Sequence, residues 1–436
     1  MAQRGSSAGG GRNRRAGLVS RRRALGYTQE RIAHELAVDV STVARWERGR
    51  TGPLASMRPE LARLLEVSLA ELAELIDGLP VPEPVPSAAD GVLDTAWTSQ
   101  RIGEFRDGVR ADAAPAVTAA EAPRLAHRWL VTDPPGSVAR RGGRRIGREV
   151  VESVAVRAER LRHADDVLAG GELHLTVRRE LADAATLLGE ASYAEQHGRR
   201  LLAAIAELCH LAGWSTADAG FGPHAENYYL HGIGAAHAAD DPVLAGHLVS
   251  SLAYHVANFG DARDAALLAR SALAGAKGRL SSTTRALFLA RLAWACARNG
   301  ERDQAERALG EARESYERRH DGECDPEWVY WMSPDEMDVV VGHTQVELGA
   351  ARRATPLLEN AIGGCDRRRA RELSLYTTWL AEAHVQTGEL DRAAELAQDA
   401  CRLNEATASS YSNGRVRDLL RRIRRYGLEV DDSTVY

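Results

Sequence analysis

The chain has 436 residues, of which 44% are hydrophobic and 5% aromatic, and its formal net charge is −5. This length exceeds one ordinary core and predicts two or three folded units, and the abundance of Ala and Leu favours helix over sheet. The five scattered cysteines form no Cys-x-x-Cys pair and no apolar run reaches the roughly 18 residues of a membrane span, which argues against zinc, a disulfide scaffold and a bilayer and favours the cytoplasm.

Positive charge is concentrated at the N-terminus. Residues 1–50 hold eleven arginines and four acidic residues, a net charge of +7, which leaves −12 for the rest of the chain. Residues 1–16 are mostly Gly, Ser and Arg and predict a disordered basic arm. A positive head on an acidic body is typical of a module that binds a polyanion such as nucleic acid.

Three short helices are expected next, over residues 17–25, 29–37 and 40–48. Gly26 supplies a left-handed stop after the first helix, and Thr28 and Asp39 can cap the second and third. The second and third helices each have one apolar face, formed by Ile32, Ala33, Leu36, Val43 and Trp46. The outer face of the third helix then carries Val40, Ser41, Thr42, Arg45 and Arg48, and Arg45 has the donors for a guanine edge.

The stretch from Tyr27 to Gly49 resembles the Xre (phage repressor/Cro-like) helix-turn-helix family. The resemblance rests on Thr-Gln at 28–29, Ser-Thr at 41–42 and Glu-x-Gly at 47–49, and the run 59–72 resembles the two closing helices, so that residues 17–77 are covered. It implies base contacts by Val40, Ser41 and Arg45 and phosphate contacts by Gln29, Thr42 and Arg50. Ala37 and Glu66 replace common glycines of the family, and we expect alanine to fit the turn. The alternative is a helical cluster that only packs or dimerises.

Proline then marks a boundary. Residues 78–86, Gly-Leu-Pro-Val-Pro-Glu-Pro-Val-Pro, predict a semi-stiff polyproline II spacer. Because residues 87–118 have weak periodicity, we expect 78–118 to be linker and weakly structured chain. Helices are expected at 121–131, 148–169, 173–188 and 193–219, so that 119–199 forms the helical first part of the second unit. The basic run 140–145 is either a loop that helps to hold DNA or, as we favour, a solvated turn.

A repeat covers residues 200–405. Glycine recurs at 220, 260, 300, 349 and 388, alanine follows each one five residues later, and a Gly or Ala follows seven residues after that. The glycine turns the chain inside a helical hairpin, and the small residues let helices approach closely. The pattern resembles tetratricopeptide repeats with lengthened helices. With residues 406–436 as a capping helix and tail, the expected fold is all-α: a Cro-like helix-turn-helix bundle followed by a tetratricopeptide-like solenoid.

The position six residues before each glycine should face the concave side of this array. It is occupied by Trp214, Tyr254, Trp294, His343 and Glu382, and neighbouring turns add His210, Asn258 and Arg298. These residues predict a groove for a peptide or a small organic molecule, although packing between hairpins is an equally good interpretation. The aromatic insert 320–338 is a lid, a dimer contact or, as we favour, a gap filler. The histidines at 224, 231, 237, 247 and 255 match no ligand spacing, so we expect no metal site and no cofactor.

No Gly-rich phosphate loop, Gly-x-Ser-x-Gly or His-Glu-x-x-His motif is present, and we expect no catalytic residues and no enzyme. The combined layout resembles peptide-pheromone-responsive regulators and similar actinobacterial regulators. It implies a transcription factor that binds a double-stranded DNA operator as a homodimer and responds to a ligand in its repeats. The alternative is a scaffold in which the repeats bind a protein and the head tethers the complex to DNA.

Overall fold

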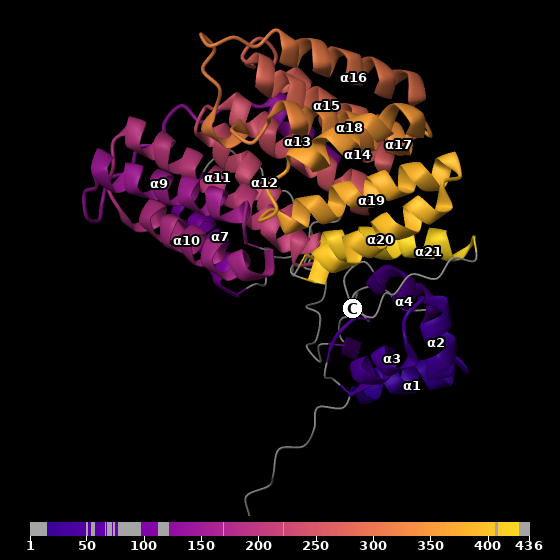
Figure 1. The fold of residues 1–436 in the computed structure, drawn as a ribbon. Coiled ribbons are helices and arrows are strands. Elements are labelled where there is room, and N and C mark those ends of the chain that lie inside the picture. The colour runs from indigo at the N-terminus through magenta and orange to yellow at the C-terminus, as the bar shows by residue number, and fades with distance from the viewer. Residues whose placement is uncertain are drawn as a thin grey trace, which may run out of the picture. The chain divides into compact units, whose positions relative to one another are not determined.

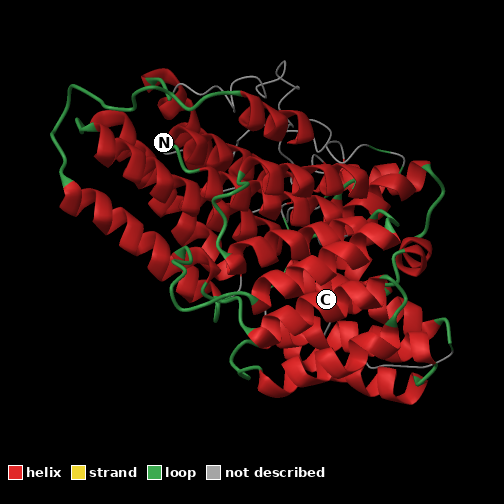
Figure 2. Cartoon of the chain, turned by 90° about the horizontal axis from the view of Figure 1, so that it is seen from above, coloured by secondary structure: helices red, strands yellow, loops and turns green. Residues whose placement is uncertain are grey.

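The computed structural model describes two compact units, Met1–Val85 and Pro86–Tyr436. The fold is all-α: Figure 2 shows helices joined by loops, with no strand in the part of the chain that is described. The basic arm before residue 15, Arg50 and the spacer at 78–86 lie outside that part. The described residues are 15–48, 51–53, 57–65, 67, 72, 75–76, 97–111, 122–168, 170–220, 222–405 and 409–426.

The first unit contains the three short helices expected from the sequence, followed by a fourth. They are α1 (Ala16–Ala24), α2 (Gln29–Glu35), α3 (Val40–Glu47) and α4 (Arg58–Leu64) (Figure 1). Thr28 Oγ1 accepts the amide hydrogen of Arg31 at 3.1 Å, and Asp39 Oδ1 accepts that of Ser41 at 2.7 Å, so both predicted caps are confirmed. The predicted apolar faces of α2 and α3 meet α1 and α4 in one core.

The turn between α2 and α3 depends on a residue in the left-handed region. Ala37 has φ of +51°. A Cβ atom in this region costs about 1 kcal/mol, a penalty that glycine does not have. Alanine therefore adopts the turn, as expected, but at a cost in backbone free energy.

The second unit begins with four helices that the sequence predicted only in part. Helices α8 (Ala122–Val131), α9 (Arg148–Asp165) and α10 (Gly170–Glu190) lie close to the expected ranges, whereas α7 (Ser99–Ala111) falls in the stretch expected to be weakly structured. It buries Ile102, Phe105 and Val109 in the core of the unit and packs on α10. Their spacing of three and four residues was the available signal. The basic run 140–145 is an exposed loop that makes isolated bridges to residues 192 and 193.

Five helical hairpins follow, and each predicted glycine lies in the turn of one of them. Four of these glycines have positive φ, whereas Gly260 does not. The alanine five residues after each glycine is completely buried. A Cβ atom on Gly232 would lie 2.7 Å from Leu248 Cδ2, so the small residue there is required for close packing. The hairpins are α11 (Glu195–Asp218) with α12 (Gly222–Ala238), α13 (Pro242–Phe259) with α14 (Ala262–Gly275), α15 (Ser282–Arg298) with α16 (Arg302–Glu317), α17 (Pro334–Glu347) with α18 (Ala351–Gly364), and α19 (Ala370–Thr387) with α20 (Leu390–Glu405) (Figure 1).

The first helices of these hairpins close around an interior. Helices α11, α13, α15, α17 and α19 pack on one another in that order, and α21 (Ser410–Arg424) packs on both α19 and α11. Ser409, which caps α21, donates its hydroxyl to Asp218 at the end of α11. The sequence predicted a curved groove, and the final helix packs against α19 and α11, so that the groove becomes a deeper, partly open cavity. None of the described helices combines the length and apolar character that crossing a bilayer requires.

Candidate functional site

The outward face of α3 carries most of the residues expected to contact DNA. Ser41 and Arg48 are exposed, and Val40 and Arg45 are half-buried at its margin. Thr42 is 6% exposed, and its Oγ1 accepts a hydrogen bond from Arg45 at 3.0 Å. The prediction that Thr42 faces outward is therefore wrong, and this side chain instead orients Arg45.

A buried ion pair fixes α3 against α1 and α2. Arg22 Nε lies 2.5 Å from Glu47 Oε1, and the two side chains are 10% and 6% exposed. Gln29 Nε2 donates to Glu47 Oε2 at 2.6 Å. Glu47 thus receives donors from α1 and α2, which gives the Glu-x-Gly part of the motif a structural role. Gln29, expected to contact phosphate, uses its side-chain amide to position α3.

A second candidate site lies inside the second unit. Helices α11, α13, α15, α17, α19 and α21 surround a cavity of about 220 Å³. Of the predicted ligand residues, five line it: His210, Trp214, Tyr254, Trp294 and His343. Trp294 is only 3% exposed and its ring lies 4.6 Å from that of His343, so the aromatic row both packs and lines the cavity.

Three predicted ligand residues do not line this cavity, and each has another partner. Asn258 lines a smaller neighbouring cavity, where its Oδ1 accepts a hydrogen bond from Tyr411 at 3.4 Å. Arg298 lies 2.9 Å from Glu347 and donates to the carbonyl of Ala257 at 3.2 Å. These contacts link the C-terminal ends of neighbouring helices.

Glu382 forms ion pairs with two arginines: its Oε2 lies 3.0 Å from Arg415 Nη2, and its Oε1 lies 2.5 Å from Arg422 Nη1. Both arginines belong to α21, so Glu382 anchors the helix that closes the cavity. In the last hairpin the cavity wall is formed instead by Trp379, one turn earlier than Glu382. The prediction that the residue six positions before each glycine lines the groove therefore fails in this hairpin. An aromatic residue one turn earlier, Trp379, could have indicated the correct position from the sequence.

Sequence reasoning missed His247 and Arg291 in the cavity wall. The His247 ring stacks on Trp328, with the centroids 3.9 Å apart and the planes inclined by 12°. Arg291 donates to Ser251 Oγ at 2.6 Å and reaches Ser250 Oγ at 3.5 Å. In the sequence His247 stands out only as one of five closely spaced histidines, and the repeat pattern does not predict that Arg291 lines the cavity.

The charged groups of the cavity differ in how they are compensated. Arg371 lies 3.2 Å from Asp165 and 2.8 Å from Glu372, and Arg369 lies 3.1 Å from Glu336. Arg291 has no carboxylate partner among the described residues. Burial lowers the pKa of the Arg291 guanidinium to about 10, so it remains charged at neutral pH.

Burial also keeps the neighbouring histidines neutral. It lowers the pKa of His210 to about 3, and the charge of Arg291 acts in the same direction. Burial lowers the pKa of His343 to about 3 and that of His247 well below its usual value. The cavity therefore places one uncompensated cation among neutral imidazole and indole rings.

The aromatic insert forms part of the cavity wall. Trp328, Tyr330 and Trp331 line the cavity, and Trp328 is buried. The insert is held at one end by Glu323, which accepts from the amide and hydroxyl of Ser282 at the start of α15. At the other end Tyr330 donates to Asp166 at 2.7 Å. The insert thus fills a gap, as favoured, and also covers one side of the cavity.

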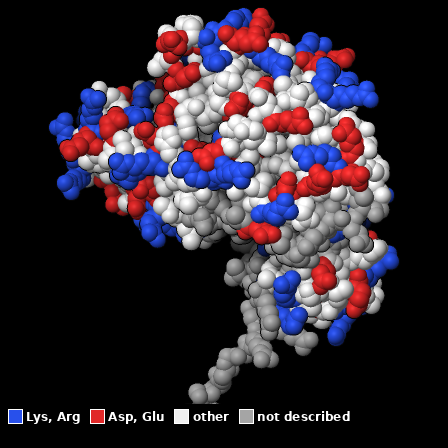
Figure 3. Space-filling view, viewed as in Figure 1, with Lys and Arg blue, Asp and Glu red and all other residues white. Residues whose placement is uncertain are grey.

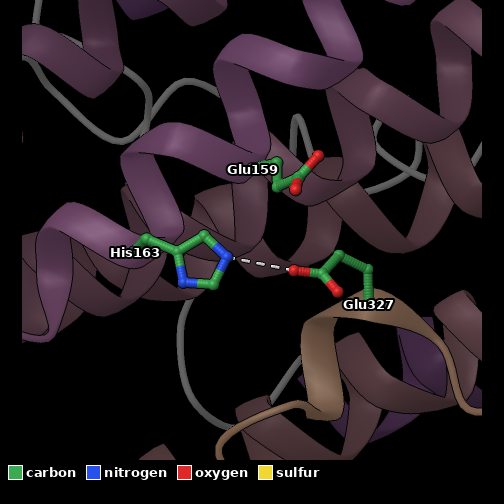
Figure 4. A group of neighbouring side chains, drawn as sticks. All are labelled: Glu159, His163 and Glu327. Carbon is green, nitrogen blue, oxygen red and sulfur yellow. Dashed lines mark hydrogen bonds and ion pairs between the residues drawn. The ribbon is translucent and has the colours of Figure 1, made fainter.

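Next to this contact lies a small group of polar side chains. Figure 4 shows Glu159 and His163 on α9 facing Glu327 of the insert, with His163 Nε2 and Glu327 Oε1 3.1 Å apart. Their ligand atoms all lie within 4.8 Å of one another, so this trio has the donor set for a metal ion. It includes none of the five histidines of the predicted run. In the structure the His163–Glu327 contact fastens the insert to α9.

Charge on the visible face of the second unit is mixed. Figure 3 shows basic and acidic side chains interspersed over Pro86–Tyr436, without a broad patch of one sign on that face.

Comparison with known proteins identifies the first unit. Residues 18–72 match a family model described as "Helix-turn-helix". These residues form an Xre-type helix-turn-helix domain, a DNA-binding regulator domain, and this part of the resemblance is confirmed. No curated protein matched the chain.

Proposed function

We propose that the chain is a sequence-specific transcriptional regulator whose second unit senses a small molecule or peptide. The observation that carries the DNA-binding part is the outward face of α3 in a helix-turn-helix domain. Ser41 and Arg48 are exposed there, and Arg45 is held by Thr42 at the edge of the same face. In this proposal Val40, Ser41 and Arg45 contact bases, Arg48 and Arg50 contact phosphates, and Gln29 positions α3 through Glu47.

The experiment is selection of bound fragments from genomic DNA by the purified full-length protein and by its Arg45→Ala variant. We expect the native protein to enrich discrete palindromic sites. Arg45→Ala should lose about 1–3 kcal/mol of discrimination, because a bidentate arginine–guanine contact is worth that much. Arg63→Ala is the matched control, since Arg63 is a 71% exposed arginine on α4 of the same unit. Equal enrichment by native protein and Arg45→Ala would refute the assignment of Arg45.

The palindromy of the proposed sites requires two copies of the chain. A homodimer that places two helix-turn-helix domains on one face of DNA needs half-sites about 34 Å apart, or a multiple of this distance. Light scattering of the full-length protein with its selected site should give two chains for each DNA. A single chain on an unpaired half-site would contradict the homodimer.

The sensing part is supported by the aromatic cavity, because a concave space lined by aromatic side chains together with polar groups that can orient a ligand is typical of small-molecule sites. The alternative scaffold would present a broad charged concave surface to a protein partner. In the second unit the concave side closes around the cavity instead, which favours a ligand over a docked protein.

A further inference from the structure

The polar groups of the cavity wall include several that have no partner. Both ring nitrogens of His247, which is 2% exposed, have no hydrogen-bond partner among the described residues. The same holds for Trp294 Nε1, His343 Nδ1 and Trp379 Nε1, on side chains that are at most 4% exposed. All four residues line the cavity. Buried polar groups without partners are rare in native proteins, so these five atoms mark a stretch of the wall whose hydrogen bonding the described residues leave incomplete.

The chemistry of these groups limits what can complete them. Indole nitrogens only donate hydrogen bonds, and a neutral imidazole offers one donor and one acceptor. Arg291 adds a half-buried cation whose protein contacts are two serine hydroxyls. Bringing a charge into low dielectric without a counter-charge is costly. An anionic ligand group would supply the missing counter-charge and would accept the free donors of Arg291.

The walls define the rest of the ligand. Trp214, Tyr254, Trp294, Trp328 and Trp379 line the cavity, and aromatic side chains favour planar rings as partners. The volume of about 220 Å³ is below the roughly 300–1,000 Å³ of typical small-molecule pockets. A compact ligand therefore fits better than a peptide of several residues.

We propose that the cavity binds a planar aromatic carboxylate, whose carboxylate pairs with Arg291 beside Ser251, His210 and His247 while its ring lies between the tryptophans. This proposal rests on the proposed function only in naming the ligand that the second unit senses. Arg291 is close to both histidines, because Ser251 Oγ contacts Arg291 at 2.6 Å and His210 Nε2 at 3.0 Å, and the His210 and His247 ring centroids lie 4.3 Å apart. The anionic end of the ligand thus lies where α11, α13 and α15 meet.

The test uses two probes that share a ring and differ in charge, naphthalene-2-carboxylate and naphthalene-2-carboxamide. Binding to the full-length protein without DNA is measured by calorimetry. We expect the native protein to bind the carboxylate at least about tenfold more tightly than the amide, and Arg291→Gln to remove this preference, a change of about 1.4 kcal/mol. Arg285→Gln should leave both affinities unchanged, because Arg285 lies on the same helix but is 46% exposed and pairs with Glu311.

Three results would overturn the proposal: no binding of either probe, equal affinity of the native protein for both, or equal weakening of both by Arg291→Gln. If Arg291→Gln fails to fold, Arg291→Lys keeps the charge but loses the paired donors of guanidinium. It should then retain a carboxylate preference smaller than that of the native protein, and an unchanged preference would count against Arg291 as the anchor.

The outcome is separable from the proposed regulatory function. Carboxylate binding that depends on Arg291 but leaves DNA occupancy unchanged would refute sensing and support the site. DNA binding that does not depend on Arg45 would refute the assigned DNA contacts and would leave the carboxylate site standing.

Discussion

Glu47 provides a direct test of how the DNA-reading helix is held in place. Its carboxylate accepts from Arg22 at 2.5 Å and from Gln29 at 2.6 Å, in a site where the Arg22 and Glu47 side chains are 10% and 6% exposed. Glu47→Gln preserves the shape but leaves the Arg22 charge buried without its counter-charge. Breaking a buried pair in this way costs about 3 kcal/mol. We expect the first unit to open about a hundredfold more often, since every 1.4 kcal/mol is tenfold.

The assay is hydrogen–deuterium exchange of the full-length protein, because peptides from residues 15–48 report on the first unit separately from the second. Faster exchange should be confined to the first unit, and binding to the selected DNA should weaken although Glu47 touches no DNA in our proposal. Glu35→Gln is the control: Glu35 pairs with Arg31 on the exposed face of α2, at 2.7 Å with 61% and 31% exposure. Such a surface pair contributes about 0.5 kcal/mol. If Glu47→Gln exchanges no faster than Glu35→Gln, the ion pair does not hold α3.

Three further predictions concern stability. Ala37→Gly should raise the free energy of unfolding of the first unit by about 1 kcal/mol by relieving the left-handed alanine, and exchange of residues 15–48 that does not slow would show that the turn is unstrained. Glu382→Gln should release α21 from the second unit, because it removes the buried carboxylate that pairs with the half-buried Arg415, and breaking such a pair costs about 3 kcal/mol. Proteolysis after residue 405 should then accelerate, and an unchanged cleavage rate would contradict the anchor. Acidification from pH 7 to 5 should destabilise the second unit, since the folded pKa of His210 and His343, about 3, lies below the unfolded value. The unfolded chain then takes up the protons, at a cost of about 2 kcal/mol for each histidine, and His343→Gln should flatten the dependence of the unfolding midpoint on pH.

The sequence by itself determined most of the helices, apart from α7, and the positions where helices pack most closely. Thr28 and Asp39 marked helix starts because their side chains bond to nearby amides, an interaction within a few residues of chain. The recurring glycines and alanines located all five hairpins because turns and close helix contacts exclude larger side chains locally. The same periodicity placed His210, Trp214, Tyr254, Trp294 and His343 on one side of the array, and the structure brings these five together.

Only the tertiary structure decided that the concave side of the array forms a cavity. Helix α21 reaches back to α11 and closes the groove, a contact between segments about two hundred residues apart that no local pattern encodes. Direct packing of α13 on α15 brings Arg291 and His247 to a shared cavity wall, and the arrival of α21 directs Glu382 to the arginines of that helix. Thr42 likewise turned inward because the orientation of α3 is set by the buried Arg22–Glu47 pair and the surrounding core. Periodicity identifies the apolar face of a helix, whereas contacts with distant segments decide which further residues are covered and by what.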